Sequence, residues 1–175
     1  MGSAVSGRVL FWVVGLSVVA ADVVTKQIAV GVLSRTAVPV LGDWLQFRLV
    51  YNPGAAFGLH VGAYSRIVFM VLAIVALIVL GAMAYRTPPR EWFRLTALGL
   101  VCGGAVGNLA DRIRSSRGVV DFIDVYIGSF HWPTFNIADI AVTCGALALA
   151  ATFWYEGRQT QAASRAKESA DAAEA

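Results

Sequence analysis

Four long apolar stretches constrain this chain more than any other feature of its sequence. Each is roughly 18–22 residues long, which as an α-helix is enough to cross the ~30 Å hydrocarbon core of a bilayer. Backbone amides in lipid have no water to bond with, and a helix satisfies them internally. The stretches run from Val9 to Val30, from Ile67 to Tyr85, from Phe93 to Ala110 and from Ile137 to Tyr155.

The composition supports a membrane location. Hydrophobic residues make up 58% of the 175 residues and charged residues only 14%, whereas a soluble domain carries about 25% charged residues. A soluble domain of this length could not bury so much apolar surface. We therefore predict a membrane all-α protein with four transmembrane helices, forming one domain over residues 1–155. The Ala-rich, charged segment 156–175 predicts a polar tail that is disordered or weakly helical.

Several classes of function are not predicted. The net charge is +3, but the basic residues are scattered singly, so we expect no nucleic-acid partner. Cys102 and Cys144 lie in apolar runs without disulfide or metal-ligand spacing. His60 and His131 are the only histidines, so a histidine metal site is not expected. We expect neither a metal nor another cofactor, and we see no Ser-His or Cys-His nucleophile motif.

The distribution of positive charge leaves the orientation open. Four spans place both termini on one side of the membrane. Lysine and arginine then divide seven against seven between the two sides, so their bias does not select the cytoplasmic side. The short loop 86–90, with an arginine at each end, is typical of a cytoplasmic connection.

The segment between the first two apolar stretches alternates with period two, which predicts a β-strand over Trp44–Tyr51. One face carries Leu45, Phe47, Leu49 and Tyr51, and the other carries Trp44, Gln46, Arg48 and Val50. The segment Gly118–Ile127 is rich in β-branched and aromatic residues and could pair with it. We therefore expect a small sheet on the membrane surface, with a β segment at about residues 36–58.

Two acids fall where the fourth helix begins and where the third has just ended. Asn136 is a candidate N-cap, and Asp139 then lies in the first helical turn, near the positive end of the dipole. These two residues could form only a capping pair, or Asp139 could point into the bundle. Asp121, flanked by apolar residues, is expected at the same membrane depth, as an ordinary loop acid or as a second site carboxylate.

Other polar residues occupy the same end of the predicted bundle. Charged groups in or beside spans are costly and indicate function by default. Asp22 and Lys26 lie one helical turn apart and can pair. Asn52 belongs to an Asn-Pro-Gly sequence, and it either forms a plain turn or orients a carboxylate or a substrate carbonyl.

The third apolar stretch ends with Asn108 and Asp111. An acid at a helix C-terminus is unfavourable for the dipole, so Asp111 needs a cation, for which Arg112 and Arg114 are the nearest candidates. Glycines at every fourth position, Gly99, Gly103 and Gly107, give this helix a smooth face for close packing.

Two neighbouring carboxylates predict aspartic-protease chemistry. Like charges a few ångströms apart cannot both ionise easily, so one retains a proton. The ionised acid can take a proton from water while the other activates a scissile carbonyl. A small proton-coupled transporter or channel, and a structural membrane protein, are the alternatives. A transport path needs polar groups at several depths, and the stretch Ile67–Tyr85 carries no charge.

Five sequence blocks, in order and in register, resemble the bacterial lipoprotein signal peptidase (signal peptidase II) family. The resemblance covers residues 9 to 155. The blocks are Asp22 with Lys26, Asn52–Gly58, Gly103–Arg112, Val119–Phe122 and Phe135–Asp139.

The resemblance implies a role for each matching residue. Asp121 and Asp139 match the catalytic dyad of the family. Positions that line or shape the site match Asn52, Gly54, Asn108, Arg112 and Asn136, and supporting polar positions match Asp22, Lys26 and Asp111.

The resemblance also implies the setting of the reaction. It implies a bacterial inner-membrane protein with cytoplasmic termini, an extracytoplasmic sheet and a mobile flap near Gly58 to Tyr64. The implied partners are membrane lipid and a diacylglyceryl-modified prolipoprotein, cut just before its lipidated cysteine. We expect the protein to act as a monomer.

Overall fold

Each apolar stretch is a helix that is long and apolar enough to cross a membrane. The structure is a computed structural model that describes residues 6–33, 36–54 and 62–173. The described helices are α1 (Gly7–Val32), the 3-10 helix η2 (Gly62–Tyr64), α2 (Ser65–Arg86), α3 (Trp92–Arg114) and α4 (Ile137–Ala173). The described strands are β1 (Val38–Leu41), β2 (Leu45–Asn52), β3 (Val119–Ile127) and β4 (Phe130–Phe135).

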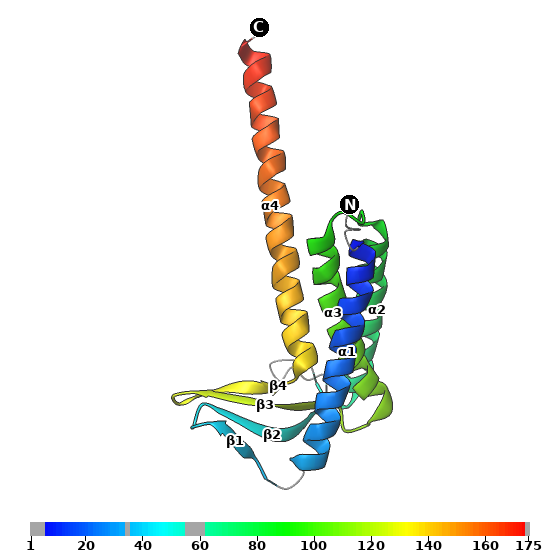
Figure 1. The fold of residues 1–175 in the computed structure, drawn as a ribbon, viewed down its shortest axis with the longest axis vertical. Coiled ribbons are helices and arrows are strands. Elements are labelled where there is room, and N and C mark those ends of the chain that lie inside the picture. The colour runs from blue at the N-terminus through cyan, green and yellow to red at the C-terminus, as the bar shows by residue number, and fades with distance from the viewer. Residues whose placement is uncertain (1–5, 34–35, 55–61, 174–175) are drawn as a thin grey trace, which may run out of the picture.

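The helices stand side by side, and the sheet lies across one end of them (Figure 1). The N-terminus is at the opposite end from the sheet, where the Gly7 amide donates to the Pro89 carbonyl in the α2–α3 loop at 3.0 Å. α4 starts at the sheet and runs back along the bundle and beyond it. The sheet therefore marks one membrane side, and the N-terminus and the α2–α3 loop mark the other.

α3 is the central helix because its glycines allow close approach on two faces. A Cβ added to Gly103 would lie 2.7 Å from the Gly15 carbonyl of α1, and one added to Gly99 would lie 2.7 Å from the Phe11 carbonyl. Gly104 meets the Ala138 carbonyl of α4 in the same way. Small residues let transmembrane backbones pack directly, and the predicted smooth face is confirmed against α1.

The predicted strand and its partner are confirmed. β2 pairs antiparallel with β3, with Val50 opposite Asp121, and the full strand order is β1-β2-β3-β4. Phe47 and Leu49 pack against a buried cluster that includes Phe122, as their face of the alternation predicts. β4 was not expected from the sequence. Positions 55–58 of the expected β segment lie outside the described residues.

The β3–β4 pairing contains an irregularity. Ile123 pairs with Phe135 and Val125 pairs with Trp132, so one residue of β3 faces two of β4. The extra residue forms a β-bulge, which bends a strand and re-aims its side chains. One of the bulged residues is Pro133, which has no N–H to donate to a ladder.

Two further expectations concern the flap and the tail. Residues 58–61 of the expected flap lie outside the described residues, and Gly62–Tyr64 is the 3-10 helix η2. The tail was expected to be disordered or weakly helical, and in the structure α4 continues through it to Ala173. No proline follows Tyr155, and the segment is rich in alanine, the best helix former.

Candidate active site

α1 contributes a buried ion pair. Lys26 Nζ lies 2.7 Å from Asp22 Oδ2, and the two residues are 4% and 0% exposed. The same ammonium lies 2.8 Å from Asp111 and donates to Asn108 Oδ1 at 3.0 Å. The expectation that Arg112 or Arg114 would pair with Asp111 is therefore wrong. The close α1–α3 approach brings a lysine from another helix within reach.

Asp22 also acts on the helix that follows the sheet. Its second oxygen, Oδ1, accepts the backbone N–H of Ala138 at 2.9 Å. The first N–H groups of a helix have no intrahelical partner, and a carboxylate there is favoured by the helix dipole. A side chain of the first span thus fixes where the fourth span begins.

The start of α4 is a reciprocal cap. Asn136 Oδ1 accepts the Asp139 N–H at 2.9 Å, and Asp139 Oδ2 accepts the Asn136 N–H at 3.2 Å. This is the capping-box arrangement, so the predicted capping pair is confirmed. Asp139 Oδ1 remains for a different contact, a 2.8 Å hydrogen bond from Asn108 Nδ2. The capping and site interpretations of these residues are therefore compatible.

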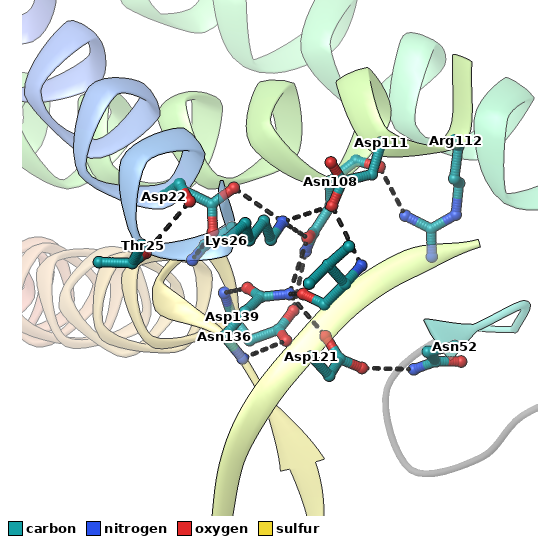
Figure 2. Close-up of polar contacts among 12 residues, drawn as sticks. Asp22, Thr25, Lys26, Asn52, Asn108, Asp111, Arg112, Asp121, Asn136 and Asp139 are labelled. Atoms are coloured by element: carbon teal, nitrogen blue, oxygen red, sulfur yellow. Dashed lines mark hydrogen bonds and ion pairs between the residues drawn. The ribbon is translucent and has the colours of Figure 1, made fainter. Parts of the chain in front are cut away.

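β3 places Asp121 beside this cap (Figure 2). Its two oxygens accept one amide each, from Asn136 Nδ2 at 2.7 Å and from Asn52 Nδ2 at 3.1 Å. Asn52 Oδ1 in turn accepts the Gly54 N–H at 3.0 Å, which sets which end of its amide faces Asp121. Asn52 and Gly54 therefore form a turn that also orients a carboxylate.

The Asp121 carboxyl is 2% exposed. Burial, followed by the negative charge of Asp139, raises the pKa of Asp121 to about 7, against an opposing effect of the Asn52 and Asn136 hydrogen bonds. Roughly half of the Asp121 carboxyl groups therefore hold a proton at pH 7, next to a second carboxyl group. A carboxyl group that keeps a proton near neutral pH can serve as a general acid.

Arg112 closes the site on the side of the segment after β2. Its Nη2 donates to the Gly54 carbonyl at 2.6 Å and its Nη1 donates to the Asn108 carbonyl at 3.2 Å. Arg66 of α2 donates to the Arg112 carbonyl at 2.7 Å. The guanidinium is therefore held by two backbone carbonyls, and Arg66 fixes the backbone that carries it. Its positive charge lies close enough to Asp139 and Asp121 to interact with them.

A cavity of about 310 Å³ opens onto both acids. Its polar side includes Asn52, Asn108, Arg112, Asp121 and Asp139. Its apolar side includes Trp132, Pro133, Phe135, Ile140 and Val142. Such a cavity, apolar with a few convergent polar groups, is the usual form of a binding site.

The ten residues that the sequence predicts for the site lie in one connected network (Figure 2). Every link between them is a hydrogen bond or ion pair described above. Within the described ranges, no group of three or more His, Cys, Asp or Glu side chains is placed to hold a metal ion. The role of each of the ten predicted site residues in the chemistry is still a prediction.

Sequence reasoning missed a second buried acid. Asp124, three residues after Asp121, is 0% exposed and bonds to side chains of β2 and β4. The signal was present, since a second acid in a strand of otherwise apolar residues needs partners. His131, which the sequence shows only as an isolated histidine, is one of them.

Comparison with known proteins agrees with this geometry. Residues 14–155 match the model of the family described as Signal peptidase (SPase) II. The chain is 38% identical over 157 residues to a lipoprotein signal peptidase of Syntrophotalea carbinolica, covering 89% of this chain and 96% of that protein. It is 35% identical over 147 residues to one of Francisella tularensis subsp. novicida, covering 82% and 91%.

A solved structure extends the agreement to the fold. A bacterial membrane enzyme determined by the in meso method at 2.3 Å superposes with a TM-score of 0.74 and 30% sequence identity, covering 83% of this chain and 87% of that one. The chain belongs to the signal peptidase II family and is a multi-pass membrane protease with that family's function.

Proposed function

We propose that Asp121 and Asp139 are the catalytic pair of an aspartic endopeptidase that cleaves diacylglyceryl-modified prolipoproteins just before the lipidated cysteine. The main support for assigning Asp121 and Asp139 as the catalytic pair is that the structure places them together. Both residues line one cavity. The Asn136 side chain bonds to both, because its Nδ2 donates to the Asp121 carboxyl and its Oδ1 accepts the backbone N–H of Asp139. The relatives are lipoprotein signal peptidases, which supports the substrate class.

The two acids divide the proton chemistry. The raised pKa of Asp121, about 7, supports Asp121 as the protonated member. In its ionised form, Asp139 takes a proton from a water molecule, and the oxygen of that water attacks the scissile carbonyl carbon. Asp121 donates its hydrogen bond to the carbonyl oxygen. Asp139 then passes the proton to the leaving amine nitrogen while the tetrahedral intermediate collapses, and the peptide bond breaks.

The asparagines and the arginine keep this pair in position. Asn52 and Asn136 fix both oxygens of Asp121, and Asn108 fixes one oxygen of Asp139. Arg112 brings a positive charge to the cavity that holds developing negative charge in the transition state.

The location of the site supports an extracytoplasmic reaction. The sheet and the acids lie at one end of the bundle, and the N-terminus lies at the other with the α2–α3 loop. That loop has Arg86 and Arg90 at its ends, which favours the cytoplasmic side. We propose a bacterial inner-membrane protein with cytoplasmic termini. One chain supplies all ten site residues, which supports a functional monomer.

A lipidated substrate suits this location. The four spans bring the cavity to the membrane boundary, and the apolar side of the cavity gives the apolar residues around the scissile bond a dry surface. The signal helix and the acyl chains can then stay in lipid while the peptide bond reaches the acids. Binding needs no transfer of these groups into water.

The test is cleavage of a diacylglyceryl-modified prolipoprotein by the purified protein in detergent. Asp121→Asn and Asp139→Asn should each lose nearly all activity while remaining folded. Asp43→Asn is the matched control, because Asp43 is an exposed acid in the β1–β2 turn. The unmodified prolipoprotein should be a poor substrate. Near-parent activity in either dyad variant would refute the assignment of that aspartate.

The alternatives have less support. A proton-coupled transporter needs polar groups through the membrane, and α2 has no charge between Ile67 and Tyr85. A structural protein would tolerate loss of either acid, which the same experiment measures.

A further inference from the structure

Asp124 is a buried carboxylate that the mechanism above does not use. It receives four side-chain donors from the strands on either side. From β2, Gln46 Nε2 donates at 2.8 Å and Arg48 Nη2 at 3.4 Å, and the Arg48 guanidinium forms an ion pair with the carboxylate at 3.0 Å. From β4 come His131 Nε2 and Thr134 Oγ1, the latter at 3.0 Å. One carboxylate thus joins three strands through side chains.

These bonds occur where the backbone ladder is interrupted. The bulge in β4 falls between the Ile123–Phe135 and Val125–Trp132 pairs, directly opposite Asp124. A bulge leaves an extra residue unpaired and disrupts the ladder locally. The Asp124 side chain supplies, through Thr134, a connection that the backbone does not make there. It also bonds to His131, which pairs with Tyr126 in the regular ladder beyond the bulge.

The bulged segment is also one side of the cavity. Trp132, Pro133, Thr134 and Phe135, which we call the β4 wall, all line the cavity that holds Asp121 and Asp139. Asp124 and Asp121 are on the same strand, three residues apart. The distance from the β4 wall to the dyad is therefore set through β3, with Asp124 as the fastening point.

The charge of Asp124 contributes to this fastening. Burial alone would raise the pKa of Asp124, but the hydrogen bonds from His131, Gln46 and Thr134 and the charge of Arg48 outweigh it and lower the pKa. The group is therefore ionised at neutral pH. Hydrogen bonds to a charged acceptor are about twice as strong as those between neutral groups.

We propose that Asp124 is a positioning residue that holds the β4 wall against the apolar part of the substrate next to the scissile bond, and so determines substrate affinity. The proposal rests on the proposed function for its substrate. Asp124 does not line the cavity, so it acts through the wall. It affects the binding of substrate and transition state alike, which changes KM and leaves kcat in place.

The first test compares Asp124→Asn with the parent, in the full-length protein in detergent. Asparagine keeps the size of the side chain but removes the charge and one acceptor oxygen. We expect KM for the lipidated prolipoprotein to rise about 5- to 30-fold, the range expected when one set of buried bonds is lost. kcat should remain within about twofold of the parent. Asp43→Asn, the acid-to-amide control in the same sheet, should change neither.

A second variant reaches the same anchor from outside the cavity. His131 is not among the cavity residues, and its ring stacks on Tyr126 with centroids 4.7 Å apart. His131→Phe keeps the stacked ring and removes the donor to Asp124. KM should rise with kcat retained. The double variant Asp124→Asn with His131→Phe should add little to Asp124→Asn alone, because both changes remove the same link.

Amide hydrogen exchange gives a readout that is independent of cleavage. In Asp124→Asn, residues 130–135 should exchange faster, while α3 keeps its parent protection. Unchanged exchange in 130–135, or a drop in kcat with KM unchanged, would overturn the proposal. If the parent itself fails to cleave, the proposed function is refuted, and exchange alone then decides whether Asp124 holds the wall.

Discussion

Asn136 and Asp139 hydrogen-bond to each other in both directions across the first turn of α4, at 2.9 and 3.2 Å. The side chain that accepts from Asp139 also donates to Asp121 at 2.7 Å. One asparagine therefore starts the fourth span and orients the other acid. These two tasks use different atoms, the amide oxygen for the cap and the amide nitrogen for Asp121.

Substitutions at Asn136 should separate the two tasks. Asn136→Ser keeps a good N-cap acceptor but has no amide donor, whereas Asn136→Ala has neither. We expect both variants to lose most activity. The alanine variant should be less stable than the serine variant by about 1 kcal/mol, the usual value of an N-cap. Thermal unfolding in detergent beside a cleavage assay measures both. Equal stability of the two variants would contradict the capping role.

The pH dependence of kcat/KM should report the ionisation of Asp121. Its pKa is raised to about 7, chiefly by burial and then by the charge of Asp139. The mechanism needs Asp121 protonated, so kcat/KM should fall as the pH rises through about 7. The raised pKa of Asp121 also makes the stability of the folded protein depend on pH, in the same direction. The contribution of protonated Asp121 to folding stability is fully present below pH 3.8, the ordinary pKa of an aspartate, and is lost as the pH rises through about 7.

Replacing Asn52 should shift the pH at which kcat/KM falls on the alkaline side. The Asn52 amide stabilises the ionised form of Asp121 and so lowers its pKa. Asn52→Ala should therefore shift the alkaline limb to higher pH, in addition to lowering the rate. The measurement is kcat/KM from about pH 5 to pH 9 for both proteins. A shift to lower pH would mean that a different group controls the limb.

Loss of the Lys26 charge should destabilise the bundle. Lys26→Met would leave Asp22 and Asp111 without the cation that lies 2.7 and 2.8 Å from them. Breaking a buried ion pair by removing one partner costs about 3–5 kcal/mol. Arg114→Met is the control, since Arg114 is an exposed cation at the end of α3. Denaturant unfolding in mixed micelles should separate the two variants, and equal stabilities would refute the role given to Lys26.

The packed glycines of α3 should differ sharply from Gly81 of α2, which has open space beside it. A methyl group at Gly103 would meet the Gly15 carbonyl at 2.7 Å, whereas one at Gly81 of α2 meets nothing within 4 Å. Gly103→Ala should cost about 1–3 kcal/mol through overpacking. Gly81→Ala should be neutral or stabilising, because alanine is the better helix former. A stable Gly103→Ala protein would show that α1 and α3 can move apart without loss.

Hydropathy and capping chemistry predict much of this fold. The four spans are set by length and composition, and the start of α4 is set by Asn136 and Asp139, whose contacts are local. The pairing of β2 with β3 follows from alternation and β-branched content. In these cases the sequence signal lies within a few neighbouring residues, even where, as for β2 and β3, the paired segments are far apart along the chain.

Other features depend on contacts between distant segments. The partner of Asp111 is Lys26, from the first helix, and not a neighbouring arginine, because the glycine face brings α1 close. β4 contains a histidine and a proline and was missed, since its pairing with β3 is interrupted by a bulge at the proline and is supported there by a side-chain bond to Asp124. Such contacts appear only when the helices and strands are placed together.

The network in which Asp22, Asn136 and Arg112 each hold a piece of backbone also bears on how this protein can evolve under a drug. Asp22 holds the N–H of Ala138, Asn136 caps α4, and Arg112 holds the carbonyl of Gly54. An inhibitor that contacts these polar groups leaves few escape mutations, because a change that weakens the drug also weakens the fold. Resistance should then arise at the apolar members of the β4 wall, Trp132, Pro133 and Phe135, whose side chains line the cavity without belonging to this network.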